Sequence, residues 1–202
     1  MAKPFAFHTQ IPVSRVGPPF QHADPLLLLG SCFAAEVGDQ LRAAGHCAVS
    51  NPLGTIFNPA SLQQTVSRLA SAARFSVSDI EWCERQNLYF SYEAGTCCSS
   101  ASADEMVAGL NRRVEAGHSS LIQSRCLFLT LGSAWAYALS NGNVVANCHR
   151  QPQQHFERVL LSPDAATQHI LDAVTAARHV NPELMVVLTV SPVRHWREGP
   201  GA

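Results

Sequence analysis

Residues 25–34 read Pro-Leu-Leu-Leu-Leu-Gly-Ser-Cys-Phe-Ala, and this stretch is the clearest indication of the fold class. Its apolar first half is typical of a strand that is buried on both faces of a parallel sheet. The strand ends at Gly30, and a helical pattern follows from Phe33 to Ala44. A serine at such a turn lies beside the N–H groups of a helix N-terminus, which can stabilise an oxyanion. Ser31 is therefore a candidate nucleophile, and the alternative is that it only caps the helix.

The rest of the chain alternates strand and helix patterns. Further strands are predicted at 47–49, 125–131 and 184–190, and helices at 60–73, 102–116 and 162–180. The pattern breaks at 76–100, where we expect a small antiparallel insert, and Asn141-Gly142 predicts a hairpin within 137–145. Alternating strands and helices indicate a parallel sheet with crossover connections. We expect one α/β domain over residues 1–202.

Composition and charge argue against several classes of partner. The 202 residues carry a formal net charge of −1, which gives no reason to expect binding to nucleic acid or to an anionic membrane. No apolar run approaches the roughly 18–20 residues that span a bilayer, and residues 1–10 lack the apolar core of a signal peptide. We therefore expect a cytoplasmic protein.

Cysteine usage points to free thiols. The seven cysteines form no C-x-x-C pair and are an odd number, so neither a disulfide framework nor a metal site is expected. They are Cys32, Cys47, Cys83, Cys97, Cys98, Cys126 and Cys148. The sequence predicts no cofactor, and it gives no indication of the oligomeric state.

Three of the predicted strands end in polar, turn-forming clusters, at 30–32, 132–135 and 191–195. In open α/β sheets, ligands bind outside the carboxyl ends of the strands. Because these ends lie at one edge of a parallel sheet, we expect the three clusters to converge on one site.

Five blocks of sequence carry a family resemblance. They are Gly-Ser-Cys-Phe-Ala at 30–34, Asn-Pro-Leu-Gly-Thr-Ile-Phe-Asn-Pro at 51–59, Leu-Gly-Ser-Ala-Trp at 131–135, Val-Val-Ala-Asn-Cys-His at 144–149 and Thr-Val-Ser-Pro-Val-Arg-His at 189–195. In this order they resemble the bacterial GSCFA family, a relative of the SGNH-type esterases and lipases. The resemblance covers the chain from about residue 11 to about residue 197. It implies a three-layer α/β/α, flavodoxin-like fold with a mostly parallel sheet.

The resemblance also implies roles for individual residues. Ser31 stands in Gly-Ser-Cys where SGNH enzymes carry Gly-Asp-Ser, and it is the expected nucleophile. Because the serine of Gly-Asp-Ser is third in that motif and Cys32 is third here, Cys32 is the rival nucleophile. Gly54 matches the glycine that donates to the oxyanion in the second SGNH block. Ser133 is the side-chain donor where the third block carries Asn, and Asn147 is a possible substitute for that Asn.

The general base is the part of the pattern that the sequence does not supply. SGNH enzymes use a late Asp-x-x-His, and no Asp in this sequence is followed three residues later by His. The resemblance places that block downstream of the last matching block, so we expect a domain shortened at its C-terminus. His195 is a candidate substitute base or pocket residue. Arg194 is a candidate for binding an acidic group of the substrate, and His149 is a further pocket candidate.

The expected function is hydrolysis of a small O-acyl ester, on a carbohydrate among other carriers, with a small-molecule ester as the partner. The missing Asp-x-x-His block would impair this activity. Two alternatives stay open at this point: an inactive fragment or vestigial binding protein with the same fold, and a thiol enzyme that uses Cys32.

Overall fold

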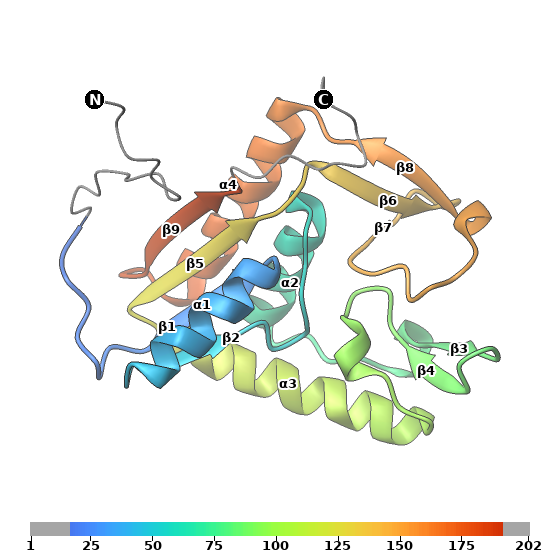
Figure 1. The fold of residues 1–202 in the computed structure, drawn as a ribbon, viewed down its shortest axis with the longest axis horizontal. Helices are drawn as coiled ribbons and strands as arrows, with labels where there is room; N and C mark the ends of the chain where they lie inside the picture. Colours follow the sequence, from blue (N-terminus) through green and yellow to red (C-terminus); the bar gives the residue numbers. More distant parts are fainter. Residues whose placement is uncertain (1–16, 192–202) are drawn as a thin grey trace, which may run out of the picture.

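The computed structural model describes residues 17–191, and a four-stranded parallel sheet forms its centre (Figure 1). The strands are β1 (Leu26–Gly30), β2 (Ala48–Ser50), β5 (Cys126–Leu131) and β9 (Met185–Val190), in the order β2-β1-β5-β9. All three pairings are parallel. If these four strands are renumbered 1 to 4 in chain order, the spatial order in the sheet is 2-1-3-4. This is the order of the first four strands in flavodoxin-like sheets.

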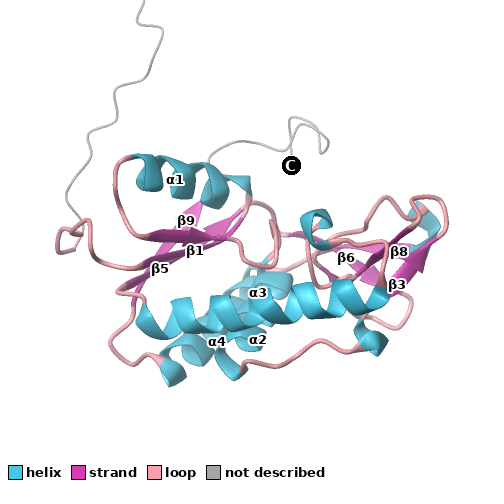
Figure 2. Cartoon of the chain, turned by 90° about the horizontal axis from the view of Figure 1, so that it is seen from below, coloured by secondary structure: helices cyan, strands magenta, loops and turns pink. Residues whose placement is uncertain are grey.

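Helices cover both faces of this sheet, as the edge-on view shows (Figure 2). Helix α1 (Cys32–Ala43) lies on one face, and α2 (Pro59–Ser71), α3 (Ala103–Gln123) and α4 (Pro163–Val180) lie on the other. The three-layer α/β/α architecture with a parallel sheet is therefore confirmed.

The apolar run at the start of β1 supplies side chains to both layers. Leu27 and Leu29 belong to the large cluster on the side of α2, α3 and α4, whereas Leu26 and Leu28 belong to the smaller cluster beneath α1. All four are almost fully buried. Burying each leucine contributes about 1.5–3 kcal/mol, so a strand that is apolar on both faces is stable only between two helical layers.

Local capping explains where most helices begin. The Asn58 side chain accepts from the N–H of Ser61 at the start of α2, and Ser162 does the same for Ala165 in α4. Each cap precedes a proline at the first helical position, which suits the fixed φ of that residue.

The predicted end of α3 near residue 116 is wrong, because the helix continues to Gln123. Gly117 lies within the helix, where an added Cβ would approach a Leu69 methyl carbon to 2.7 Å. This glycine therefore permits close packing of α3 on α2, and that contact holds the helix beyond the point where local propensity would end it.

Two small antiparallel sheets lie beside the parallel one. The predicted insert contains β3 (Glu81–Cys83) and β4 (Leu88–Phe90), with the short helices η1 (Val77–Asp79) and η2 (Thr96–Cys98). The predicted hairpin forms β6 (Trp135–Leu139) and β7 (Val144–Val145). Strand β8 (Phe156–Leu160), which follows the short helix η3 (Gln153–His155), pairs with the other side of β6. The sequence did not predict β8, because this half-exposed strand is held by long-range pairing with β6.

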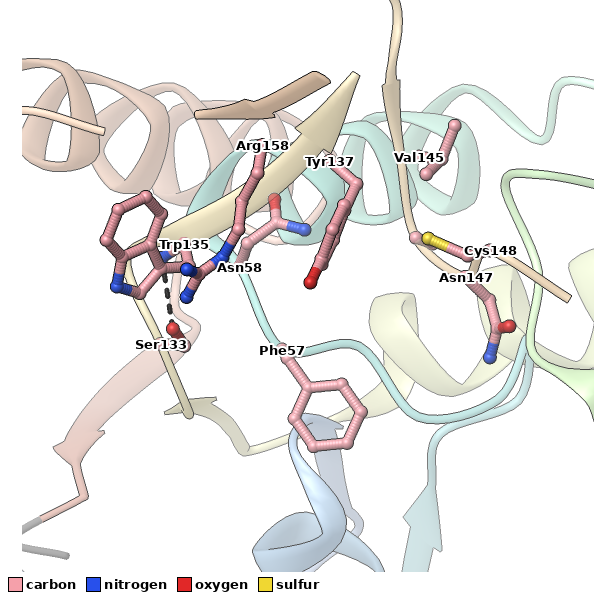
Figure 3. A pocket seen from close by; sticks show the side chains of 10 residues that line it. Phe57, Asn58, Ser133, Trp135, Tyr137, Val145, Asn147, Cys148 and Arg158 are labelled. Carbon is pink, nitrogen blue, oxygen red and sulfur yellow. Dashed lines mark hydrogen bonds between the residues drawn. The ribbon is translucent and has the colours of Figure 1, made fainter. Parts of the chain in front are cut away.

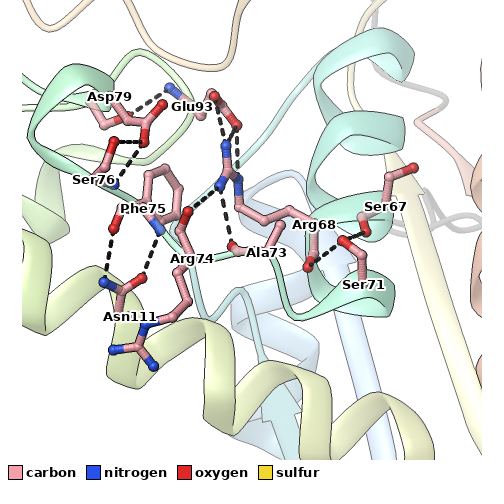
Figure 4. Close-up of polar contacts among 11 residues, drawn as sticks. Ser67, Arg68, Ser71, Ala73, Arg74, Phe75, Ser76, Asp79, Glu93 and Asn111 are labelled. Carbon is pink, nitrogen blue, oxygen red and sulfur yellow. Dashed lines mark hydrogen bonds and ion pairs between the residues drawn. The ribbon is translucent and has the colours of Figure 1, made fainter.

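Polar contacts tie the insert to the helical layer (Figure 4). The guanidinium of Arg68 in α2 donates to both carboxylate oxygens of Glu93, and it also lies 3.9 Å from the centre of the Phe75 ring. The Asn111 side chain in α3 accepts from the N–H of Phe75 at 2.7 Å and donates to its carbonyl at 3.0 Å. These contacts fix both ends of the insert. Among the described residues, no helix combines the length and apolarity that crossing a membrane requires.

The close approach of β1 and β5 yields a first testable prediction. Gly30 has φ +130°, and a Cβ there would lie 2.2 Å from the Thr130 carbonyl oxygen. We expect Gly30→Ala to lower the free energy of unfolding by about 3 kcal/mol or more, because the backbone of β5 would have to move. Urea unfolding measures this loss.

Gly109→Ala is the matched control, since its Cβ would meet only the end of the Arg112 side chain at 3.8 Å. Within a helix this change should stabilise by about 0.5–1 kcal/mol. Equal effects of the two substitutions would contradict the close approach at Gly30.

Candidate active site

The turn after β1 directs the Ser31 side chain into the sheet. Ser31 is only 6% exposed, and its Oγ lies 3.2 Å from Thr130 Oγ1. Its N–H donates to Thr130 Oγ1 at 2.9 Å and to the Thr130 carbonyl at 3.0 Å. Both the N–H and the hydroxyl of Ser31 thus join β1 to β5. Ser31 occupies the N-cap position of α1 without a side-chain capping bond.

Cys32, the next residue, has the opposite environment. It is the first residue of α1, and its side chain is exposed, as is that of Phe33. The first N–H groups of a helix have no acceptor in a preceding turn. In the described part of the chain, the Ala34 N–H donates to the Ser31 carbonyl, and no backbone bond is recorded for the N–H of Cys32 or Phe33. Cys32 therefore presents a thiol beside two backbone donors.

Asn51 holds this turn from the neighbouring strand β2. It has φ +44°, a left-handed conformation that Asn tolerates better than most residues. Its Oδ1 accepts from the Gly30 N–H at 2.8 Å, and its Nδ2 donates to the Ser31 carbonyl at 3.4 Å. Sequence reasoning identified Asn51 as part of a family block and gave it no further role.

Gly54 forms the turn that positions Asn51. It has φ +93°, and its N–H donates to the Asn51 carbonyl at 2.8 Å. A Cβ at Gly54 would lie 2.7 Å from the Cα of Gly95, so this glycine packs against the insert. To donate to an oxyanion, as the family resemblance implies, the Gly54 N–H would first have to break its hydrogen bond to the Asn51 carbonyl.

A cavity of about 370 Å³ lies near the end of β5 (Figure 3), and neither Ser31 nor Cys32 is among the residues that line it. At Gly132 an added Cβ would lie 3.2 Å from the Ser31 Cβ and 3.1 Å from the Phe57 ring, and Phe57 is one wall of the cavity. The N–H groups of Gly132 and Ser133 both donate to the Phe57 carbonyl. The ends of β1 and β5 therefore converge on one site, as the sequence predicts.

Ser133 and Asn147 both line this cavity. Ser133 Oγ accepts from the Trp135 N–H at 3.0 Å, which leaves the hydroxyl hydrogen to donate elsewhere. Asn147 Oδ1 accepts from the His149 N–H at 2.8 Å. Their roles as oxyanion donors stay predictions.

The remaining walls were not predicted from the sequence. The aromatic rings come from β6 and from the loop before α2, and the Arg158 guanidinium of β8 lies 3.7 Å from the centre of the Trp135 ring. Figure 3 labels most of these side chains around the same space; they are Phe57, Asn58, Trp135, Tyr137, Val145, Cys148 and Arg158. Ala146 also lines the cavity. Arg158 could be recognised as a cavity residue only from the pairing of β8 with β6, and the sequence did not predict that pairing.

His149 does not line the cavity, contrary to the sequence interpretation. It is 2% exposed, and its Nε2 lies 2.8 Å from the Ser91 carbonyl and 2.9 Å from the Ala94 carbonyl. Its ring also lies against Phe90. Burial lowers the pKa of His149, and the two carbonyl acceptors oppose this effect in part. His149 thus joins the loop after β7 to the insert.

Two predicted site residues, Arg194 and His195, lie outside the described residues, so their roles stay predictions. The third polar cluster is described only at Ser191, whose N–H donates to the Leu131 carbonyl at 3.2 Å. Within residues 17–191, no three side chains among His, Cys, Asp and Glu gather as a metal site would require.

Fold and site together define a parallel α/β protein with a candidate nucleophile at its first strand-to-helix turn. The chain belongs to the GSCFA family, whose model matches residues 25–201. The family resemblance is therefore confirmed over nearly the whole chain, with the match beginning at residue 25 rather than near residue 11. Comparison with curated proteins and with solved structures gave no significant match.

The Asn51 contacts yield a second prediction. Asn51→Gly keeps the left-handed backbone but leaves the Gly30 N–H without its acceptor. We expect it to lower the free energy of unfolding by about 1–3 kcal/mol, because a partly buried donor loses its bond. Asn51→Asp retains the acceptor and should cost less. Urea unfolding of both variants checks this, and a Gly variant as stable as the wild type would contradict the role.

Burial of His149 yields a third prediction. Because its pKa is lowered in the folded state, the unfolded chain takes up a proton first as the pH falls. Neutral His149 therefore contributes fully to the free energy of unfolding at pH values above the unfolded pKa of about 6.5. This contribution is lost progressively as the pH falls below that value. We expect stability to decline between about pH 7.5 and pH 5.5, and less so in His149→Gln.

Chemical unfolding at several pH values measures this slope. The exposed His155 provides the control, because His155→Gln should leave the slope unchanged. Identical pH profiles for His149→Gln and the wild type would show that His149 does not cause the decline.

Proposed function

We propose that this chain carries the nucleophile and binding cavity of an SGNH-type ester hydrolase, and that Cys32 is the nucleophile. The substrate is a small O-acyl ester. The observation that carries the proposal is the contrast between adjacent residues at the end of β1. Cys32 is exposed at the start of α1, whereas the Ser31 hydroxyl is buried against Thr130.

The chemistry at this turn is acyl transfer to sulfur. The Cys32 sulfur attacks the ester carbonyl, the C–O bond breaks, and the alcohol leaves with a proton. Water then attacks the thioester, which releases the carboxylic acid and restores the thiol. The N–H groups of Cys32 and Phe33 at the start of α1 are suitable donors for the developing oxyanion.

A thiol also suits the groups present at this turn. A serine hydroxyl needs an adjacent general base, whereas cysteine is partly ionised near neutral pH and is intrinsically nucleophilic.

The cavity supports a small substrate with an apolar face. Its volume of about 370 Å³ lies near the lower end of ligand pockets, which span about 300–1,000 Å³. Three aromatic side chains, of Phe57, Trp135 and Tyr137, line it, and Ser133, Asn147 and Arg158 add polar groups. Rings of this kind suit an acyl chain or the apolar face of a sugar.

The fourth prediction tests the nucleophile directly. After brief exposure to p-nitrophenyl acetate, we expect the tryptic peptide 16–42 to gain one acetyl group, with the modification on Cys32. This peptide contains both Ser31 and Cys32 and no other cysteine. Tandem mass spectrometry and lability to hydroxylamine distinguish a thioester from a serine ester.

Matched variants separate the alternatives. Cys32→Ala should abolish acetylation of the peptide, and Ser31→Ala should retain it while losing some stability. Cys47→Ser controls for an exposed cysteine away from the turn. The reverse pattern would make Ser31 the nucleophile, and a fluorophosphonate would then label it. A folded wild-type protein that acetylates at neither residue would refute the proposed function.

A further inference from the structure

Two adjacent cysteines lie at the end of the insert, away from the nucleophile turn in sequence. Cys97 and Cys98 belong to the short helix η2, and their sulfur atoms are 3.8 Å apart. Cys98 is buried, whereas Cys97 is exposed. An open surface depression, lined also by Ser99, Ser100, Arg112 and Arg113, gives access to the pair.

The two sulfurs differ in acidity. The hydrogen bond with Cys98, with the positive charge of Arg113 as a smaller contribution, lowers the pKa of Cys97 to about 6. The same hydrogen bond and burial raise the pKa of Cys98. The exposed sulfur of the pair is therefore the more readily ionised, and a buried thiol lies beside it. This combination is typical of a reactive cysteine beside a resolving cysteine.

Packing holds the pair in place from behind. The Gly95 N–H donates to the Leu53 carbonyl at 2.8 Å, and Arg113 Nη1 donates to the Pro52 carbonyl at 3.1 Å. A Cβ at Gly54 would lie 3.3 Å from the Cys97 sulfur. The loop at 52–54 and helix α3 thus keep Cys97 facing the depression.

We propose that Cys97 and Cys98 form a site of reversible oxidation by small hydroperoxides. The Cys97 sulfur attacks one peroxide oxygen, the O–O bond breaks, and Cys97 becomes a sulfenic acid while water or an alcohol leaves. The Cys98 thiol then attacks the Cys97 sulfur and displaces water, which produces a disulfide between adjacent residues. The dithiol loses two electrons and the peroxide gains them.

The product should be easy to reduce. Adjacent Cα atoms are about 3.8 Å apart, shorter than the usual separation of about 4.4–6.8 Å across a disulfide. Such a bond is strained, and strained disulfides react readily with small thiols. Excess glutathione should therefore restore the dithiol.

The fifth prediction uses the folded full-length chain and stoichiometric hydrogen peroxide. The tryptic peptide 86–112 contains Cys97 and Cys98 and no other cysteine, so its mass reports on this pair alone. We expect it to lose two hydrogen atoms before the exposed Cys47 is oxidised, and to recover them with glutathione. Fragmentation excludes oxidation of Met106 as the source of any mass change.

Two variants of the resolving cysteine sharpen the test. Cys98→Ser retains a hydrogen-bond donor but cannot form the disulfide, so dimedone should trap a sulfenic acid at Cys97. In Cys98→Ala the donor is lost, and alkylation of Cys97 by iodoacetamide at neutral pH should slow by about tenfold, because less thiolate is present. Cys47→Ser serves as the control and should leave the alkylation of Cys97 and the oxidation of peptide 86–112 as in the wild type.

The proposal is overturned if peptide 86–112 stays reduced while Cys47 is oxidised. It is also overturned if Cys97 proceeds to sulfinic acid, or joins a different cysteine, without an internal disulfide in the peptide. Neither readout depends on the nucleophile of the proposed ester hydrolase.

Discussion

The close contact between Gly30 and Thr130 fixes how strand β1 leads into helix α1. The two residues are register partners in β1 and β5, and the backbone of one passes so close to the other that no Cβ fits at Gly30. The Ser31 N–H and hydroxyl then bond to Thr130 as the chain leaves the strand. This junction sets the direction in which α1 starts, and it places the first turn against the end of β5.

The Ser31 side chain is buried against Thr130, and the exposed side chain at this turn is that of the next residue, Cys32. A strand entering a helix turns its successive side chains in different directions, so a buried Ser31 leaves Cys32 facing outward at the start of α1. Asn51 binds the same turn from β2, and its conformation is supported by Gly54. The turn is therefore held on both sides by β2 and β5, which suits a group that must keep its position during a reaction.

The cavity is built by parts of the chain that do not belong to the parallel sheet. The loop before α2 supplies Phe57, and the small sheet of β7, β6 and β8 supplies the opposite wall, including Arg158 above the Trp135 ring. His149 anchors the insert to the loop after β7, and the ion pair of Arg68 with Glu93 anchors it to α2. The parallel sheet thus positions the turn, and the appended sheets and loops shape the space beside it.

The architecture could be predicted from the sequence, because the signals that specify it are local. The doubly apolar β1, the capped starts of α2 and α4, and the Asn141-Gly142 turn each specify an element from neighbouring residues. The sequence distinguishes Thr130 only as the one polar residue within the apolar run of β5. Which side chains face the site depends instead on how distant segments pack together. The burial of Ser31 and His149, the exposure of Cys32, and the pairing of β8 depend on contacts between segments far apart in the chain. Such contacts have no periodic pattern in sequence, since they arise from the close packing of one segment on another.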